Sequence, residues 1–327
     1  MPMMRAGKSL VVHGVLLAVL AAASGLSVFS GAVHVPVGEM WGSSIIRLRL
    51  ARIMLSAVAG AGLSVAGVVF QALLRNPLAE PYVLGISSGA GLGAALAIIL
   101  GWTAAGAWTL PAVAFAGALA TILLVYALAQ TGLGPVPVHT LLLSGVIVNA
   151  VLGSVLMFLV SVAPSEDLHN VVWWLLGSLQ IFDWQLLRAV AVVVAAGVAV
   201  TLLLARDLNL MTLGDEAAAH LGLHVERTKR VFFLVASLMT GATVAACGLI
   251  GFVGLIVPHS VRLAIGPDHR RLVPASATAG AAFLVLADSF ARTAIAPSEI
   301  PIGVITALLG GPFFLLLLRR RKSSFGG

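Results

Sequence analysis

Long apolar runs separated by short polar segments make up most of the chain. A helix needs about twenty mainly apolar residues to cross the hydrocarbon core of a bilayer. Runs suited to this cover residues 10–30, 53–74, 83–101, 107–130, 139–163, 187–205, 231–264, 273–292 and 301–318. The run 231–264 is too long for one span and contains several glycines, so we divide it near Cys247-Gly248. The pattern predicts an all-α polytopic membrane protein with ten transmembrane helices, built as a single domain over residues 1–327.

One segment, residues 206–230, stays polar for longer than the other connections between these runs. Within it, residues 213–223 are expected to form a short helix. Asp215 and Glu216 suit the positive end of a helix, and Gly222 stands where a helix typically stops. Such a helix could fit a groove on another protein, or the segment could be a solvated loop with one helical turn. The pattern alone leaves both interpretations open.

Composition and charge agree with a membrane protein. Hydrophobic residues make up 60% of the chain and charged residues 9%, far from the averages of soluble domains. The net charge of +7 does not indicate nucleic-acid binding, because Lys and Arg gather at the ends of apolar runs and so set orientation. With ten spans and both termini cytoplasmic, the cytoplasmic side holds most of them: Arg5, Lys8, Arg75, Arg206, Arg227, Lys229, Arg230, Arg262, Arg270, Arg271, Arg319, Arg320, Arg321 and Lys322. We expect a protein of the bacterial inner (cytoplasmic) membrane, with 206–230 as a cytoplasmic segment.

The sequence indicates no catalytic centre. His220 and His224 have the i, i+4 spacing of metal ligands, but they lack a third ligand and an HExxH motif. The chain has no G-x-x-x-x-G-K-[ST] loop for nucleotide phosphates, and its single cysteine, Cys247, excludes a disulfide framework. We therefore expect no catalytic residue, metal site or cofactor in this subunit. Asp288 is the one clear acid within an apolar run, so an ion-coupled secondary transporter that uses Asp288 is the alternative.

Small residues recur at helical spacing in two of the apolar runs. The first set is Gly60, Ser64 and Gly67, and the second is Gly85, Gly89 and Gly93. Faces of this kind let transmembrane helices approach closely, so helix packing is the favoured interpretation. The other interpretation is that some of these residues line a translocation path.

A series of short motifs runs along the chain. They lie at residues 49–52 (RLAR), 71–81 (QALLRNPLAEP), 84–91 (LGISSGAG), 174–178 (WLLGS), 213–216 (LGDE), 251–259 (GFVGLIVPH) and 299–304 (EIPIGV). In this order they resemble the motifs of the FecCD/BtuC family, the permease subunits of type II ABC importers for iron complexes and cobalamin. The one departure is Ala51, where the family pattern RLPR has proline.

The resemblance implies a BtuC-like type II importer fold and a defined set of partners. These are a second copy of the chain, two cytosolic ABC ATPase subunits that bind ATP and Mg, and a periplasmic substrate-binding protein, all around or within membrane lipid. It implies a coupling helix formed by Leu213, Gly214, Asp215, Glu216, Ala217, His220, Leu221 and Gly222. It further implies docking of the binding protein on Arg49, Arg52 and Arg292, and a cytoplasmic gate near Thr140, Ser144 and Asn149. The expected function is ATP-driven import of a ferric siderophore, haem or cobalamin, and no residue pattern separates these cargoes.

Overall fold

The structure, a computed structural model, describes residues 2–31, 44–130, 136–180 and 183–324. These residues form helices joined by turns, and no β-strand occurs in the described ranges. The elements in chain order are α1 (Pro2–Phe29), α2 (Ser44–Leu73), the 3-10 helix η2 (Pro81–Leu84), α3 (Ile86–Ile99), the 3-10 helix η3 (Trp102–Ala105), α4 (Thr109–Ala129), α5 (Val138–Val162), α6 (Ser165–Leu175), α7 (Trp184–Leu203), α8 (Ala205–Met211), α9 (Asp215–His220), α10 (Val225–Cys247), α11 (Val253–Ile265), α12 (His269–Thr293) and α13 (Ile302–Ser324).

The all-α class is confirmed, and each predicted span coincides with an apolar helix. In the described chain, seven helices are long and apolar enough to cross a membrane: α1, α2, α4, α5, α7, α10 and α12. Three more apolar helices are shorter, namely Ile86–Ile99, Val253–Ile265 and Ile302–Leu316. The division of the longest run is also confirmed, because α10 ends at Cys247 and Gly248 leaves the helix with a φ of 69°.

Several element boundaries differ from the predictions. Helix α2 begins at Ser44 and α10 at Val225, ahead of their apolar runs, because both helices continue through polar turns at the edge of the bundle. The helix expected at 213–223 is shorter and spans Asp215–His220. Helices α6 and α8 were not predicted, since both are short and mix polar with apolar residues outside the long apolar runs.

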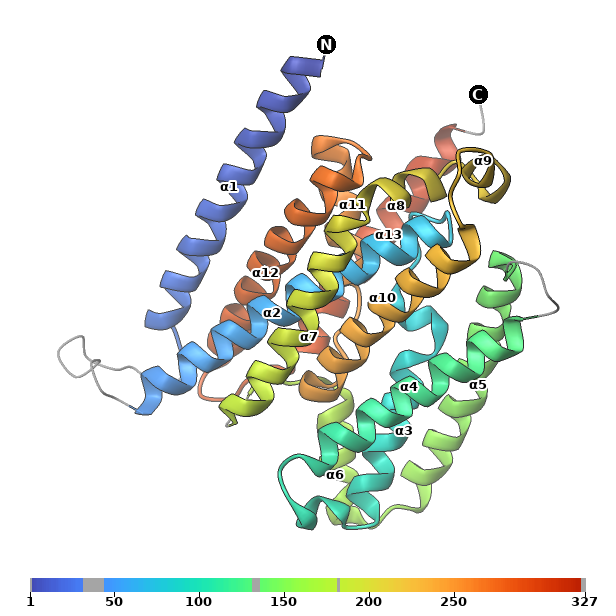
Figure 1. The fold of residues 1–327 in the computed structure, drawn as a ribbon. Coiled ribbons are helices and arrows are strands. Elements are labelled where there is room, and N and C mark those ends of the chain that lie inside the picture. The colour runs from blue at the N-terminus through green and yellow to red at the C-terminus, as the bar shows by residue number, and fades with distance from the viewer. Residues whose placement is uncertain (1, 32–43, 131–135, 181–182, 325–327) are drawn as a thin grey trace.

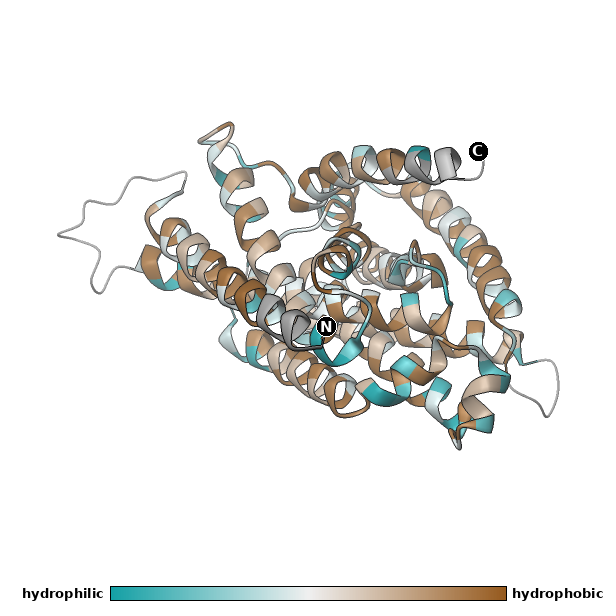
Figure 2. Ribbon diagram, turned by 90° about the horizontal axis from the view of Figure 1, so that it is seen from above, coloured by the Kyte–Doolittle hydropathy of each residue, from teal (hydrophilic) through white to brown (hydrophobic). Residues whose placement is uncertain are grey.

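Helix α2 lies at the centre of the bundle. Helices α1, α7, α10, α11 and α12 pack against it, and it is buried along most of its length. The outer helices instead expose large apolar side chains, such as Leu123 on α4, Leu143 on α5 and Val192 on α7. Figure 2 shows that hydrophobic residues make up much of the helices when the molecule is seen from above. A surface of this kind is stable where lipid chains or another apolar surface cover it.

Small residues mediate the closest helix contacts, so the packing interpretation is confirmed for both sets except at Gly85. A Cβ at Gly60 would overlap the carbonyl oxygen of Gly280 on α12, and one at Gly67 would overlap that of Gly254 on α11. Gly89 and Gly93 make the same close approach to α4. Gly85 differs from them: its φ of 81° ends η2 and starts α3, so it serves as a turn residue.

We expect the substitution Gly67→Ala to lower the unfolding free energy by about 1–3 kcal/mol, because the added methyl forces α2 and α11 apart. The matched control is Gly14→Ala on α1, where an added Cβ meets no atom within 4 Å. Alanine is a better helix former than glycine, so the control should be neutral or slightly stabilising. Thermal unfolding of both variants in detergent checks the prediction, and equal midpoints would contradict it.

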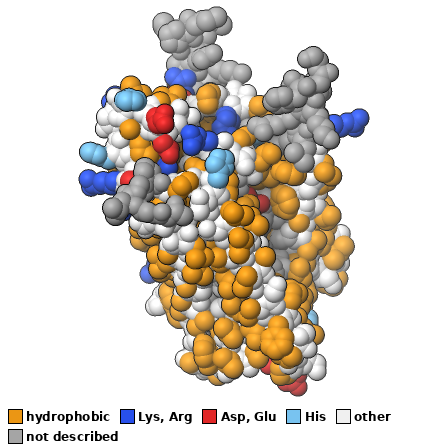
Figure 3. Space-filling view, turned by 90° about the vertical axis from the view of Figure 1, so that its right-hand side faces the viewer, with side chains coloured by type: hydrophobic (Ala, Val, Ile, Leu, Met, Phe, Trp, Pro, Cys, Tyr) orange, Lys and Arg blue, Asp and Glu red, His pale blue; other side chains and the backbone are white. Residues whose placement is uncertain are grey.

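The helices give the molecule two distinct ends. Both termini and α9 lie at one end, which we call the α9 end, whereas α6 and the start of α2 lie at the opposite end, the α6 end (Figure 1). Figure 3 shows charged side chains gathered near the α9 end, with a broad hydrophobic surface beyond them. The two candidate sites lie at these two ends.

Candidate functional site

Helix α9 is set off from its neighbours by two glycines. Gly214 caps the N-terminus of α9 with a φ of 106°, a backbone conformation that residues other than glycine rarely adopt. At the other end, Gly222 (φ 86°) donates to the carbonyl of Ala219 at 2.9 Å, and Leu223 donates to that of Ala218 at 3.0 Å. These two bonds form a Schellman motif, which satisfies the last carbonyls of the helix. The predicted stop at Gly222 is confirmed.

The outer side of α9 combines apolar and charged groups. Ala218 is fully buried against the bundle. Leu213 and Leu221 are 60% and 59% exposed, and Glu216 and His220 are exposed beside them. Because this surface lies among the charged side chains of the α9 end, it suits contact with a protein better than contact with lipid chains.

Asp215 ties α9 to the rest of the bundle. Its Oδ2 accepts a hydrogen bond from Lys229 Nζ on α10 at 2.6 Å, and its Oδ1 lies 4.0 Å from Arg75 Nη2 in the turn after α2. Between α9 and the first turns of α10 lies an open groove of about 800 Å³, lined in part by Leu223, Glu226 and Arg230. The coupling residues predicted from the sequence therefore lie together, with a fixed inner side and a free outer side. Their contact with an ATPase stays a prediction.

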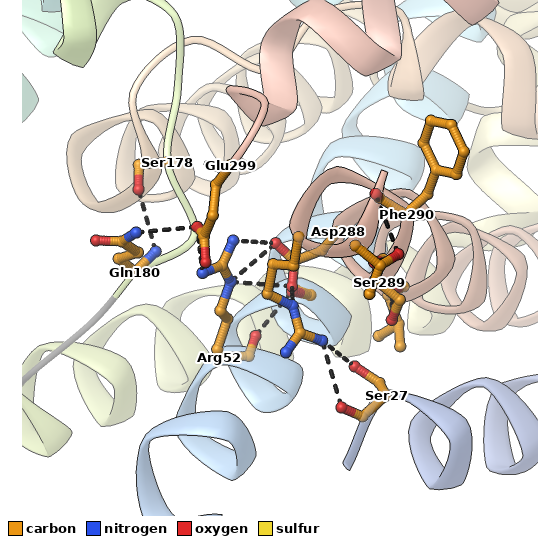
Figure 4. A network of polar contacts seen from close by, with 12 residues as sticks. Ser27, Arg52, Ser178, Gln180, Asp288, Ser289, Phe290 and Glu299 are labelled. Atoms are coloured by element: carbon orange, nitrogen blue, oxygen red, sulfur yellow. Dashed lines mark hydrogen bonds and ion pairs between the residues drawn. The ribbon is translucent and has the colours of Figure 1, made fainter. Parts of the chain in front are cut away.

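The α6 end holds a cluster of buried and partly buried charges, which we call the arginine–carboxylate cluster: Arg52, Asp288, Arg292 and Glu299 (Figure 4). Arg52 binds Asp288 through Nη2–Oδ1 and Nε–Oδ1 distances of 2.8 and 2.9 Å, and its Nη1 lies 2.8 Å from Glu299 Oε2. Arg292 Nε lies 3.1 Å from Asp288 Oδ2. The cluster joins α2 and α12 to the connection before α13.

Each charge of this cluster has its counter-charge within the chain. The side chain of Asp288 is 1% exposed, that of Arg292 4% and that of Arg52 13%. Arg292 also donates to Ser27 Oγ at 2.5 Å, which ties α1 to α12. Burial alone would raise the pKa of Glu299, but the hydrogen bond and charge of Arg52, with the bond from Gln180, hold that pKa below its usual value.

The structure brings the three predicted docking arginines close together at the α6 end, yet largely below the surface. Arg49 is 6% exposed and donates to the carbonyl oxygen of Val28 at 2.7 Å. Arg52 and Arg292 share Asp288. Docking of a binding protein on these residues stays a prediction, and it would have to act through a cluster that already holds α1, α2 and α12 together.

A pocket of about 490 Å³ opens beside the cluster. Its lining includes Arg52, Trp173, Trp174, Gln180 and Glu299. Sequence reasoning did not predict this pocket, because its walls come from segments far apart in the chain. The only signal was that the motifs at 174–178 and 299–304 both contribute to it.

The predicted gate residues all lie on α5. Ser144 is buried and Thr140 is partly buried. Asn149 accepts a hydrogen bond from Ser88 of α3 at 2.6 Å, so its side chain faces the bundle. The structure thus places them on one helix near η2 and α3, and their role as a gate stays a prediction.

The motif around residue 80 supports the break between α10 and α11. Glu80 accepts a hydrogen bond from the backbone N–H of Phe252, whose φ is 68°, and the hydroxyl of Tyr82 accepts one from Ile250 N at 2.9 Å. A buried irregular backbone needs partners of this kind for its polar groups. The motifs at 71–81 and 251–259 are evident in the sequence, but nothing in the sequence indicates that they are in contact.

Comparison with known proteins gives a consistent result. The model of the FecCD transport family matches residues 16–320. The cobalamin import system permease protein BtuC of Halobacterium salinarum is 50% identical over 276 residues, which cover 82% of this chain and 71% of that protein. The hemin transport system permease protein HmuU of Yersinia pestis is 38% identical, with 87% of this chain and 88% of that protein covered.

A solved structure has the same overall arrangement of helices. It is an inward-facing conformation of a metal-chelate type ABC transporter, with a TM-score of 0.86 and 29% identity, and the match covers 95% of this chain and 99% of that one. The likeness extends over nearly the full length, so it includes both the α9 end and the α6 end.

Proposed function

Because the chain belongs to the FecCD transport family, we propose that it is the membrane-spanning permease subunit of a type II ABC importer, driven by separate ATPase subunits that bind ATP and Mg. The observation that carries the proposal is the surface of α9. It is fixed to the bundle on one side through Asp215 and exposes Leu213, Glu216 and Leu221 on the other. A helix presented in this way can receive force from a partner at the α9 end.

The proposed topology has ten membrane spans and places the α9 end in the cytoplasm of a bacterial cell. Seven long and three shorter apolar helices of the described chain supply the spans. Both termini lie at the α9 end, and the basic residues gather there, as expected for a cytoplasmic side (Figures 1 and 3). A periplasmic substrate-binding protein would then dock at the α6 end.

A second copy of the chain completes the proposed pathway. Helix α5 exposes a run of large apolar side chains along one side: Leu143, Val146, Ile147, Val151, Val155 and Phe158. This side is available for a second subunit, and a path for a bulky cargo would lie between the two copies. A path lined mainly by apolar side chains suits a cargo that must pass without binding tightly to the walls.

The proposed cargo is a metal chelate, with cobalamin as the first candidate. Among the relatives compared above, the one named for cobalamin import shares more identity with this chain than the one named for hemin transport. Uptake of labelled cobalamin, haem and a ferric siderophore by cells that depend on this chain separates the three. Uptake of none of them would contradict the chelate proposal.

Ion coupling through Asp288 is less favoured by the geometry. A coupling carboxylate must exchange its ion with water, whereas Asp288 is 1% exposed and both its oxygens face guanidinium groups. Its contacts fit a structural counter-charge for Arg52 and Arg292.

Co-expression with ABC ATPase subunits from the same genome tests the proposal. With an affinity tag on this chain, we expect an ATPase to co-purify and its ATP hydrolysis to rise when a loaded binding protein is added. Purification of the chain without any candidate ATPase would contradict the proposal.

A further inference from the structure

Lys229 occupies an unusual position for a charged residue. It lies in the second turn of α10, is only 6% exposed, and its aliphatic chain runs along a small cavity of about 20 Å³ lined by Leu73, Tyr126 and Phe233. A buried ammonium group is costly unless it is paired and hydrogen-bonded. Lys229 meets this need with two oxygens that belong to two different elements.

The first oxygen is on α9 and the second lies at the start of α5. Lys229 Nζ donates to Asp215 Oδ2 at 2.6 Å and to the backbone carbonyl of Val136 at 3.2 Å. Val136 stands two residues before Val138, the first residue of α5, and is 4% exposed. One ammonium group therefore bridges the α9 surface and the helix that carries Thr140 and Ser144.

A second side chain of α10 binds the same residue of the α5 connection. Glu226 Oε2 accepts from the backbone N–H of Val136 at 3.3 Å, and its Oε1 accepts from the Tyr126 hydroxyl of α4 at 2.7 Å. Both backbone polar groups of Val136 are thus held by the first turns of α10. The start of α5 cannot shift relative to α10 without breaking these bonds, so α9, α10 and α5 are linked as one body at the α9 end.

We propose that Lys229 is a positioning residue that transmits displacement of α9 to the start of α5, through its simultaneous bonds to Asp215 and to the carbonyl of Val136. The inference rests on the proposed function, because an ATPase must supply the displacement. When α9 moves with its partner, the Asp215–Lys229 bond draws the first turns of α10 with it, and Val136 follows. Without this bond, α9 can still bind the ATPase, but its motion is no longer passed to α5.

Loss of the bonds made by Lys229 should have a different effect from a general loss of stability. A residue that merely stabilises the fold would affect assembly, ATP hydrolysis and transport together. Substitution of a residue that transmits motion should leave assembly and ATP hydrolysis intact and lower only transport. The decisive variant is Lys229→Met, because Lys229 is 6% exposed, lies inside the bundle and forms no part of the outer surface of α9. This substitution removes the donor of both bonds and keeps an unbranched side chain, whereas Lys229→Arg retains the charge and the donors.

The matched control is Arg206→Met on α8, an exposed basic residue at the same end that forms none of these bonds. A reporter cysteine at His139, which is exposed in the first turn of α5, can be labelled selectively because the native Cys247 is 2% exposed. The complex of the chain with its ATPase is then measured for co-purification, ATP hydrolysis, cargo uptake and the ATP-dependent change in the fluorescence of the label.

We expect Lys229→Met to assemble and hydrolyse ATP within about twofold of the unsubstituted complex. The uptake by Lys229→Met should fall by about tenfold, a size typical of coupling between sites, and its ATP response at position 139 should disappear. Lys229→Arg should retain part of the uptake and part of the ATP response, and Arg206→Met should change neither the uptake nor the ATP response. Unaltered uptake and ATP response in Lys229→Met would overturn the inference, as would a parallel loss of assembly, ATP hydrolysis and uptake. Failure of the unsubstituted chain to bind any ATPase would instead contradict the proposed function.

Discussion

Replacement of Asp288 by asparagine is expected to lower the unfolding free energy by about 3–5 kcal/mol, because it leaves buried guanidinium groups without their shared counter-charge. The carboxylate of Asp288 is within 3.1 Å of both Arg52 and Arg292, and it is 1% exposed. An amide keeps the shape of the side chain but cannot balance either charge. Chemical or thermal unfolding in detergent measures the effect.

Two further variants make this prediction specific. Asp167→Asn, in the first turn of α6 at the same end, should cost less than about 1 kcal/mol, as expected for one partly exposed helix-terminal charge. The double variant Asp288→Asn with Arg292→Met should regain much of the lost stability, because Arg52 keeps Glu299 at 2.8 Å. Equal losses in the single and double variants would contradict the assignment of Asp288 as a counter-charge.

The second large effect is expected at α9, where Glu216→Arg should reduce co-purification of the ATPase by at least about tenfold, equivalent to about 1.4 kcal/mol of binding free energy. Glu216 is exposed in the first turn of α9, so reversal of its charge changes the outer surface without touching the Asp215–Lys229 bond. Gly214→Val should have a similar effect for another reason. A side chain at a φ of 106° is strained, so α9 would leave its position.

The matched control for Glu216→Arg is Glu166→Arg, which makes the same change in the first turn of α6 at the opposite end. It should leave ATPase binding unaltered. If Glu166→Arg weakened ATPase binding as much as Glu216→Arg does, the α9 surface would not be the site of contact.

Local signals in the sequence were sufficient for most helices and for the ends of α9. Apolar runs of membrane length located the long helices, and the glycines near residue 248 located the break between α10 and α11. Asp215, Glu216 and Gly222 located α9, because acids at a helix start and glycine at its stop act within a few residues. The expected helix was nevertheless too long, since Gly214 ends the preceding turn and Gly222 leaves the helix.

Contacts between distant segments were beyond the reach of the sequence. The separation between Arg52 and Asp288 along the chain is 236 residues, and nothing in the sequence around either residue shows that they pair. Arginines at the end of an apolar run are expected to face water or a partner, so their burial in a charge cluster could not be inferred. The same holds for Lys229, which the sequence presents as one of several cytoplasmic basic residues, and whose bond to Val136 follows only from the packing of α10 against the start of α5.

The most direct test of an ATP-driven importer is transport in proteoliposomes that contain this chain with its ATPase, with the loaded binding protein outside. We expect accumulation of the labelled chelate in the lumen that requires ATP on the side of the α9 end and persists when ionophores collapse proton and sodium gradients. Accumulation that needs an ion gradient and continues without ATP would contradict the account and return Asp288 to consideration as a coupling site.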